Sequence, residues 1–375
     1  MKNHLMFFLL ALYAAVVCIQ PSMAQGAMPP SLRQQAARML IVGFRGDSVG
    51  EDVRHYLQDI GVGGVILFDR DLTGDGTRGS RNIKSPSQLK TLCQALKNTA
   101  GRKLIVAIDE EGGNVDRLKT TYGFPPTVTP KSLGARNDST ATTEAAAGIA
   151  RTLREAGINL NFAPSVDVDV NPACPIIGRL GRSFSSDTAV VAANAGWFVK
   201  AHRREGVATA IKHFPGHGSA ASDSHLGLVD VSDTWSEAEL APFRHLIDAG
   251  LVDVVMTAHI YNSHLDSTYP ATLSANVIGG LLRGKLGYDG VVASDDMYME
   301  AIVSHFTLRE AVVRAINAGV DLLVLGNNSP AGYSPERPDE VVDIIVDAVE
   351  NGDIRRERIE EAVRRIDGLL AKLDF

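Results

Sequence analysis

Residues 207–260 read VATAIKHFPGHGSAASDSHLGLVDVSDTWSEAELAPFRHLIDAGLVDVVMTAHI, and this stretch decides the fold. An apolar run, Val207–His213, is followed by a polar loop, by a segment of helical period that stops at Gly250, and by a second apolar run, Val252–Ile260. Ser236-Glu237-Ala238-Glu239 has the Ser and Glu of a capping box, so the helix is expected to begin there. Continuous apolarity suits parallel strands that are buried on both faces. The stretch therefore predicts one strand–helix–strand unit.

The same alternation fills the rest of the chain. A second helix start is predicted at Ser85-Pro86-Ser87-Gln88, again a capping box. The eight apolar runs are Met39–Phe44, Val62–Phe68, Leu104–Ile108, Ile158–Val166, Val207–His213, Val252–Ile260, Val291–Ser294 and Val320–Leu325. Eight units in one undivided chain predict a single (β/α)8 TIM barrel. A doubly wound sheet is disfavoured, because Gly43-Phe44-Arg45-Gly46 is a poor phosphate loop. Two more helices, near residues 339–350 and 354–373, should cover the barrel, with charged residues 355–361 facing solvent.

The N-terminus has the layout of a secretory signal peptide. Lys2 precedes the apolar run Leu5–Val17, which is short for a bilayer span, and Ser22-Met23-Ala24 provides small residues at a cleavage site. We expect residues 1–24 to be a signal peptide cut after Ala24 and residues 25–375 to form one domain, with no transmembrane segment in the mature chain. The mature protein would then be periplasmic or secreted. A membrane anchor is the alternative, while lipid attachment at Cys18 is disfavoured by the bulky Val17 before it.

Composition narrows the possible partners. The net charge of −7 offers no basic stripe to neutralise phosphates, which argues against a nucleic-acid partner. Two cysteines remain after cleavage, Cys93 and Cys174, and two in a domain of this length do not form a disulfide scaffold. Cys93 lies in a helical pattern and is expected to be buried.

Polar clusters follow five of the predicted strands. In a barrel the carboxyl ends of the strands meet at one rim, where the active site lies. The clusters are Asp109-Glu110-Glu111-Gly112-Gly113, Asp167-Val168-Asp169, Lys212 to Gly218, Thr257-Ala258-His259 and Ser294-Asp295-Asp296-Met297. One such cluster alone could be explained by helix capping, but five that converge on one rim predict a site.

Asp295 is the candidate nucleophile. A carboxylate at the end of a buried strand costs free energy unless it is paired or used. Asp is also a good N-cap, but Asp296 lies nearer the following helix and suits that role as well or better. A carboxylate nucleophile is what a retaining glycosidase needs to hold the sugar as a covalent ester.

Asp223 and His225 are the candidate acid/base pair. No Glu is well placed for this role, because Glu300 and Glu310 lie on the following helix. In an extended segment, residues two apart point the same way, so the Asp223 carboxylate can hydrogen-bond the His225 imidazole. Histidine titrates near neutral pH, as a group that donates and then accepts a proton requires. The alternative is a chance pair on a surface loop.

A metal site is not expected. His213, His217, His225 and His259 lie near one rim, and zinc binds imidazole. The His213–His217 spacing resembles a zincin helix, but Pro215 and Gly216 forbid that helix. The segment from Asp167 to Asn171 opens like a calcium loop but lacks its central Gly and closing Glu.

Together these segments resemble the N-acetylglucosaminidase branch of the family 3 glycoside hydrolases, from about Leu40 to the last helix. The longest motif is Lys212-His213-Phe214-Pro215-Gly216-His217-Gly218 followed, after four residues, by Asp223-Ser224-His225. Ser294-Asp295-Asp296-Met297 is similar to the family's nucleophile motif. Asp109 to Arg117 is similar to its sugar-binding segment, Asn161-Phe162-Ala163-Pro164 with Asp167 to another block, and Arg182-Ser183-Phe184 to its arginine loop.

The resemblance implies a retaining β-N-acetylhexosaminidase that uses no cofactor. It would hydrolyse terminal non-reducing β-linked N-acetylglucosamine from peptidoglycan fragments or chitooligosaccharides. Asp295 would attack the anomeric carbon, and His225, oriented by Asp223, would act as acid and then base. The residues expected to contact the sugar are Asp109, Arg117, Asp167, Arg182, Lys212, His213 and Met297.

Three departures from the family pattern affect linkage and leaving-group preference. Asn114 stands where many members carry Arg, Ser219 replaces a common Asp, and the loop 175–182 is longer than in the shortest members. Three other functions stay open. They are a phosphorylase, a β-glucosidase or β-xylosidase of the same fold, and a sugar-binding barrel without catalysis.

Overall fold

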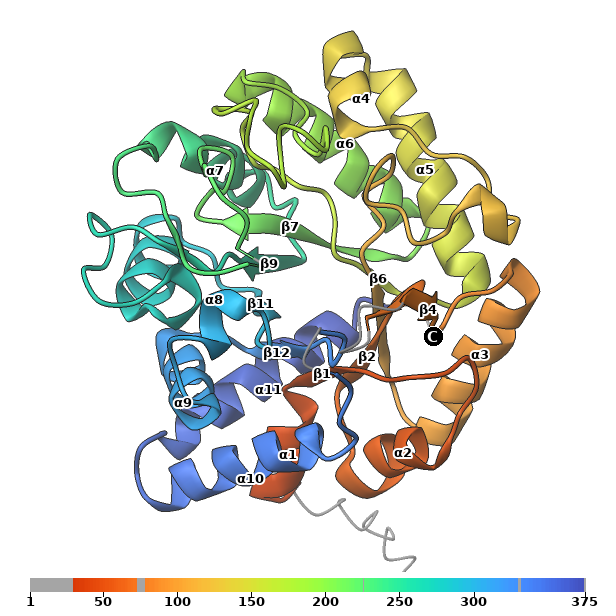
Figure 1. Cartoon of the computed structure of the whole chain (residues 1–375), viewed down its shortest axis with the longest axis vertical. Helices are drawn as coiled ribbons and strands as arrows, with labels where there is room; N and C mark the ends of the chain where they lie inside the picture. The colour runs from red at the N-terminus through yellow and green to blue at the C-terminus, as the bar shows by residue number, and fades with distance from the viewer. Residues whose placement is uncertain (1–29, 73–77, 225, 330–331, 374–375) are drawn as a thin grey trace, which may run out of the picture. The chain divides into compact units, whose positions relative to one another are not determined.

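The computed structural model describes residues 30–72, 78–224, 226–329 and 332–373. The expected signal peptide, Cys18 and the cut after Ala24 lie outside these residues. Eight strands form a closed barrel in the order β1-β12-β11-β9-β7-β6-β5-β2, and all pairings in it are parallel. The predicted (β/α)8 barrel is confirmed. Figure 1 shows the strands as an inner ring that the helices surround.

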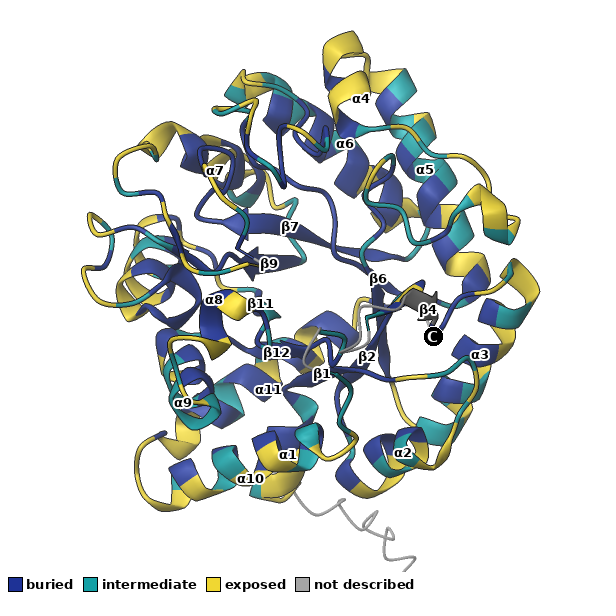
Figure 2. Ribbon diagram, in the orientation of Figure 1, coloured by how far each residue is buried: buried dark blue, intermediate teal, exposed yellow. Residues whose placement is uncertain are grey.

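Each predicted apolar run supplies one barrel strand. The strands are β1 (Leu40–Gly43), β2 (Gly64–Leu67), β5 (Ile105–Ile108), β6 (Leu160–Asn161), β7 (Ala208–Phe214), β9 (Val254–Thr257), β11 (Val291–Asp296) and β12 (Leu322–Leu325). Apart from the last two residues of β11, every one of these residues is buried. Burial on both faces explains the continuous apolarity of the runs, since the barrel interior and the helix layer both exclude water. Figure 2 shows this buried ring, with exposed residues on the outer faces of the helices.

Helices connect the strands around the outside. They are α1 (Leu32–Arg38), α2 (Glu51–Arg54) with the π-helical η1 (His55–Ile60), α3 (Pro86–Ala100), α4 (Pro130–Arg136), α5 (Ser139–Ala156), α6 (Thr188–Arg204), α7 (Ala241–Asp248), η5 (Asn276–Lys285, also π-helical), α8 (Glu300–Val303), α9 (Leu308–Ala318), α10 (Arg337–Glu350) and α11 (Arg356–Leu370). The last two are the C-terminal helices that the sequence predicts. Two short pairs lie outside the barrel, an antiparallel pair β3 (Arg70–Leu72) and β4 (Arg78–Ser80), and a parallel pair β8 (Val229–Asp230) and β10 (Ile260–Tyr261).

Neither predicted capping box is complete. Ser236 does precede a helical segment, but its side chain makes no cap hydrogen bond, and the segment begins as the 3-10 turn η3 (Glu237–Leu240). Glu239, the expected partner, is fully buried and instead accepts the amide of Gly218. At Ser85 the hydroxyl caps α3 as expected, although Gln88 accepts from Lys84 rather than from the capping residue.

The fourth strand is shorter than predicted. The run 158–166 yields only Leu160–Asn161, because pairing with β7 is interrupted before Ser165, which bridges to Lys212. Pro164 lies in the gap and has no N–H to donate to a ladder. The backbone between Asn161 and Asp167 is therefore irregular.

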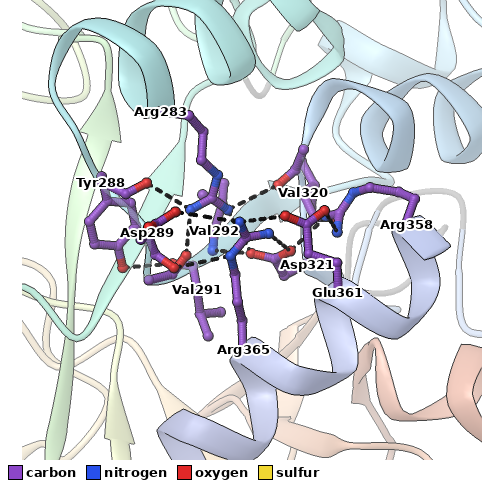
Figure 3. A network of polar contacts seen from close by, with 12 residues as sticks. Arg283, Tyr288, Asp289, Val291, Val292, Val320, Asp321, Arg358, Glu361 and Arg365 are labelled. Atoms are coloured by element: carbon purple, nitrogen blue, oxygen red, sulfur yellow. Dashed lines mark hydrogen bonds and ion pairs between the residues drawn. The ribbon is translucent and has the colours of Figure 1, made fainter.

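The charged residues 355–361 are not all solvent-exposed, as the sequence suggested. Arg358 is 7% exposed, and its guanidinium donates to Asp321 and to the Val320 carbonyl (Figure 3). Helical periodicity cannot reveal the burial of Arg358, because the aliphatic part of a long Arg side chain can be buried while its guanidinium makes hydrogen bonds.

The two remaining cysteines, Cys93 and Cys174, are both buried free thiols. Cys93 lies on α3 as expected. Among the described residues, no helix combines the length and the apolarity needed to cross a bilayer.

Candidate active site

A pocket of about 370 Å³ opens among the loops at the carboxyl ends of β2, β5, β11 and β12. Its lining contains Asp109, Arg117 and Asp295, three of the predicted site residues, together with Asp296. This is the rim that the polar clusters predict. Phe68, Phe162, Met256 and Met299 add apolar walls.

Asp295 and Asp296 end β11, and their side chains have different surroundings. Asp296 Oδ1 accepts the amides of Tyr298 at 3.1 Å and Gly326 at 2.9 Å, which holds the turn after the strand. Asp295 Oδ1 accepts the amide of Asp296 at 2.8 Å, and Asp295 remains partly exposed in the pocket. Both carboxylates line the pocket and are partly exposed, and Asp296 accepts more of the amides of the turn than Asp295 does.

Lys212, on β7, joins two carboxylates of the neighbouring rim segment. Its Nζ lies 2.6 Å from Asp109 Oδ1 and 2.8 Å from Glu111 Oε1. Burial lowers the pKa of Lys212, but the charges of Asp109 and Glu111 outweigh that effect and raise it above its ordinary value. Lys212 is therefore a fixed cation directly behind Asp109, whose side chain is 20% exposed.

Glu111 also receives the Arg182 guanidinium as a bidentate pair, at 2.8 Å from Nε and 2.6 Å from Nη2. Burial raises the pKa of Glu111, but the charges of Arg182 and Lys212 dominate and hold it well below its ordinary range. The pair fixes the loop that carries Arg182, since Nη1 also donates to the Ile176 carbonyl. Glu111 was quoted in the sequence motif without a role, and it is the hub of this cluster.

His213 lies between Arg182 and Asp167. Its Nε2 is 3.0 Å from Arg182 Nη2, and its Nδ1 is 2.6 Å from Asp167 Oδ2. A guanidinium only donates, so Nε2 accepts and Nδ1 carries the proton that is donated to Asp167. Asp167 is fully buried; burial raises its pKa, but the hydrogen bonds from His213 and from the His217 amide lower it well below the ordinary value. Asp167 was expected to contact the sugar, but it supports His213 from behind and does not line the pocket.

The segment after β7 is held at several points. The His217 amide donates to Asp167 Oδ1 at 2.8 Å, and His217 Nε2 lies 3.2 Å from the buried Ser224 hydroxyl. The Gly218 amide donates to Glu239 Oε2 at 3.1 Å. Gly218 allows this close packing, because a Cβ there would lie 1.7 Å from the Val168 carbonyl oxygen.

Asp223 lies on this segment, and its carbonyl accepts the amide of Leu226 at 3.0 Å. His225, its predicted partner, lies outside the described residues. The segment is then tied back to the barrel through β8, which pairs with β10.

Met297 does not line the pocket; it is fully buried in the hydrophobic core. Its amide donates to the Val324 carbonyl as β11 ends. Met256 and Met299 line the pocket, as the motif suggested for Met297. A motif does not specify on which side of a turn a side chain lies.

Several pocket residues had escaped the sequence analysis. Asp69 and Arg70 follow β2, and Asn328 follows β12, so both groups obey the same rule that identified the other clusters. Lys119 reaches Asp69 as an ion pair across the pocket lining. A search for polar residues after every predicted strand would have found Asp69, Arg70 and Asn328.

The rim histidines do not assemble a metal cluster within the described residues, where no group of three or more metal-binding side chains occurs. His259 has a structural role: Nε2 donates to the Asp296 carbonyl at 3.0 Å, and Nδ1 lies 2.9 Å from the Thr272 hydroxyl. This contact supports the turn that carries Asp295 and Asp296.

The chain is similar to known proteins over most of its length. Beta-hexosaminidase A of Pseudoalteromonas piscicida is 34% identical over 334 residues, which cover 83% of this chain and 54% of that protein. Beta-hexosaminidase of Tolumonas auensis is 36% identical over 295 residues, covering 77% and 83%. The chain thus spans about half the length of the first relative and most of the second.

Two solved structures match as well. A glycoside hydrolase family 3 beta-N-acetylglucosaminidase from Paenibacillus sp. superimposes with a TM-score of 0.83 at 38% identity, covering 92% of this chain and 63% of that one. Beta-N-acetylhexosaminidase from Beutenbergia cavernae gives 0.80 at 29% identity, covering 92% and 99%. The model of the glycosyl hydrolase family 3 N-terminal domain matches residues 31–369, which span the whole barrel and the motifs at its rim. The chain belongs to glycosyl hydrolase family 3.

Proposed function

We propose that this protein is a retaining β-N-acetylhexosaminidase that removes terminal non-reducing β-linked N-acetylglucosamine. The observation that supports it most directly is the pair of carboxylates that ends β11 in the pocket, where Asp296 Oδ1 accepts two amides of the turn and Asp295 Oδ1 accepts one. Asp109 lies in the same pocket, backed by the buried Lys212. The names of the similar proteins, beta-hexosaminidase and beta-N-acetylglucosaminidase, support the same substrate class.

In this mechanism the Asp295 carboxylate attacks the anomeric carbon while His225 protonates the leaving oxygen. A covalent ester forms on Asp295, and His225 then removes a proton from the attacking water, with Asp223 orienting the imidazole. Asp109 and Arg117 would hold the sugar hydroxyls and acyl group from the pocket wall. Lys212, Arg182 and His213 would fix Asp109 and the edge of the sugar site, since hydrogen bonds from preorganised charged groups are the strong ones.

The test is hydrolysis of a chromogenic β-N-acetylglucosaminide by the wild type and by Asp295→Ala. The variant should lose nearly all activity, and azide should restore turnover by forming a glycosyl azide of inverted configuration, because a small anion can replace the missing nucleophile. Glu300→Gln is the matched control, since Glu300 is exposed on the next helix. Full activity of Asp295→Ala would refute the assignment.

The acid/base pair is tested through the leaving group. His225→Ala should lose most activity on substrates whose leaving groups need protonation and least on activated aryl glycosides. An equal loss on both kinds of substrate would instead make His225 structural.

A phosphorylase is the second candidate, and the charge of the pocket argues against it. The lining has five carboxylates, Asp69, Asp109, Asp116, Asp295 and Asp296, against three cations, Arg70, Arg117 and Lys119. An incoming phosphate dianion would meet this excess of negative charge. Products formed with and without phosphate would decide, since a sugar 1-phosphate appears only in phosphorolysis.

We also propose that the mature protein begins after Ala24 and acts in the periplasm or outside the cell, on peptidoglycan fragments or chitooligosaccharides. Mass spectrometry of the N-terminus after expression in a secreting host tests the cut. An uncleaved N-terminus in the exported fraction would favour the membrane anchor.

A further inference from the structure

Glu110, between the two ion-paired carboxylates of its motif, has surroundings of a different kind. It is 1% exposed, and its Oε2 accepts the amides of Arg117 at 2.8 Å and Leu118 at 3.0 Å. Its own backbone is clamped by Asn161, whose side chain accepts the Glu110 amide and donates to the Glu110 carbonyl. The carboxyl therefore ties the end of β5 to the segment that delivers Arg117 to the pocket.

The other oxygen of Glu110 faces a second acid. Glu110 Oε1 and Asp116 Oδ1 are both buried, and neither receives a hydrogen bond from any N–H or O–H group among the described residues. Asp116 directly precedes Arg117, whose amide Glu110 accepts, so the two carboxyls are neighbours, and the other oxygen of Asp116 accepts the Thr127 hydroxyl at 3.2 Å. Two ionised carboxylates cannot hold this arrangement away from water, so one of them must carry a proton.

We propose that Glu110 is protonated and donates to Asp116, and that this shared proton positions Arg117 and Asp116 in the pocket. Burial and the neighbouring Asp116 raise the pKa of Glu110 well above its ordinary value, in keeping with this arrangement. Asp116 then stays the ionised partner and lines the pocket beside Arg117, whose buried Nε has no hydrogen-bond partner among the described residues. Glu110 is thus a positioning residue that does not touch the substrate.

The charged groups around Glu110 favour its neutral form. Glu111 is next to it in the chain and is ionised between Arg182 and Lys212. Glu144 of α5 lines the cavity behind Glu110. His202 of α6, which contacts Asn161, has its pKa lowered to about 4 by burial and is neutral. The amides of Arg117 and Leu118, which donate to Glu110 Oε2, oppose this by favouring the ionised form, but burial and Asp116 outweigh them.

The pH dependence of substrate binding follows from the proton. Once the pH exceeds the raised pKa of Glu110, two carboxylates repel each other inside the segment. We expect the KM of the wild type to rise on the alkaline side, with kcat less affected.

The variants Glu110→Gln and Glu110→Ala separate the effect of the proton on Glu110 from the effect of its hydrogen bonds to the two amides. This test rests on the proposed function, because it uses the chromogenic N-acetylglucosaminide. Gln keeps the acceptor for both amides and donates to Asp116 without a titratable proton, so its KM should stay within about twofold at neutral pH and lose the alkaline rise. Ala leaves two buried amides without an acceptor, and its KM should rise by about tenfold or more. Glu144→Gln, an exposed carboxyl on the same cavity, is the matched control.

Two results would overturn the proposal. One is a KM of Glu110→Gln as high as that of Glu110→Ala, which would mean that an ionised Glu110 is required. The other is an alkaline KM profile that Glu110→Gln shares with the wild type.

Infrared spectroscopy tests the proton without any substrate. In a Glu239→Gln background, where the raised pKa of Glu239 cannot contribute a band, the protein at neutral pH should show the carbonyl stretch of a protonated carboxyl, lost when Glu110→Gln is added and kept when Glu144→Gln is added. This band together with no hydrolysis of the glycoside would contradict the proposed function but support the shared proton. Hydrolysis without the band would overturn the shared proton alone.

Discussion

At the amino-terminal end of the barrel, fully buried Asp321 accepts from Arg358 at 2.6 Å and from Arg283 at 2.8 Å (Figure 3). At the carboxyl-terminal end, fully buried Glu111 accepts from Arg182 at 2.6 Å and from Lys212 at 2.8 Å. Each network thus surrounds one ionised carboxylate with cations. The two networks differ in the groups that accept the other hydrogen bonds of these cations.

In the amino-terminal network the protein satisfies the cations itself. Arg358 also donates to the Ile316 and Val320 carbonyls, and Arg283 to those of Tyr288 and Gly290. These bonds tie η5 and α11 to the starts of β11 and β12. In the carboxyl-terminal network the chain of contacts ends on Asp109, which is partly exposed in the pocket. The first network is a closed structural unit, and the second is held ready for a ligand.

The largest expected effect is on activity, at Lys212. Lys212→Met removes the cation between Asp109 and Glu111, so both carboxylates lose a charge-assisted partner beside the proposed sugar site. We expect kcat/KM to fall by about a hundredfold to a thousandfold, the effect of removing one preorganised charged donor. Steady-state kinetics on the chromogenic glycoside measure it. Lys200→Met, an exposed position on α6, should leave kcat/KM unchanged, and an unchanged Lys212→Met would remove the functional distinction between the networks.

At Asp321 we expect a large effect on stability and a small one on activity. Asp321→Ala leaves Arg283 and Arg358 buried without their carboxylate, which should lower the free energy of unfolding by about 3–5 kcal/mol. The kcat/KM of the folded fraction should change little, because the pocket is at the other end of the barrel. Denaturant unfolding and low-temperature kinetics on the same samples measure the two quantities.

Asp289→Ala is the matched control for this network. Asp289 contacts Arg365 at 3.7 Å, but its side chain is 96% exposed, so water replaces it at little cost. If Asp289→Ala destabilised the protein as much as Asp321→Ala, burial would not be the origin of the effect.

The barrel and the polar residues at its rim could be predicted from the sequence. Eight apolar runs with helical segments between them were enough for the barrel, because burial on both faces imposes the pattern directly on the strands. The rim clusters followed from the same topology, so Asp109, Lys212 and Asp295 were placed at one end of the barrel from the pattern of the sequence, whereas Arg117 was assigned only through the resemblance to the family's sugar-binding segment.

Partners across the barrel were beyond prediction. Arg358 was expected in solvent, since nothing in its helix indicates Asp321, which lies 37 residues away in the chain. Five residues assigned to the sugar do not line the pocket, namely Asp167, Arg182, Lys212, His213 and Met297. A motif does not tell whether a side chain faces the pocket or supports a neighbour from behind. Glu239 was expected to cap its own helix, but its carboxylate instead accepts a hydrogen bond from the Gly218 amide.

The smallest effect is expected at Glu239 and depends on pH. Burial, together with the nearby Asp167, raises the pKa of Glu239 from 4.5 to about 7, although Ser219 opposes the shift. An acid with a raised folded pKa stabilises the protein below its unfolded pKa and loses that contribution as the pH rises through the folded value. Glu239→Gln keeps an acceptor for the Gly218 amide and has no proton to lose. Relative to the wild type, it should therefore gain stability between about pH 5 and about pH 8, by about 1–3 kcal/mol.

Thermal unfolding of both proteins across this range measures the gain. The nearby His217 should not mask it, because burial lowers the pKa of His217 to about 4 and leaves it neutral throughout. Glu237→Gln, at an exposed carboxylate of the same turn, should show no such trend. If the wild type and Glu239→Gln kept a constant difference in Tm, Glu239 would be ionised at every pH tested. The carboxyl-terminal end would then hold its loop by fixed charge, as the amino-terminal end holds its strands.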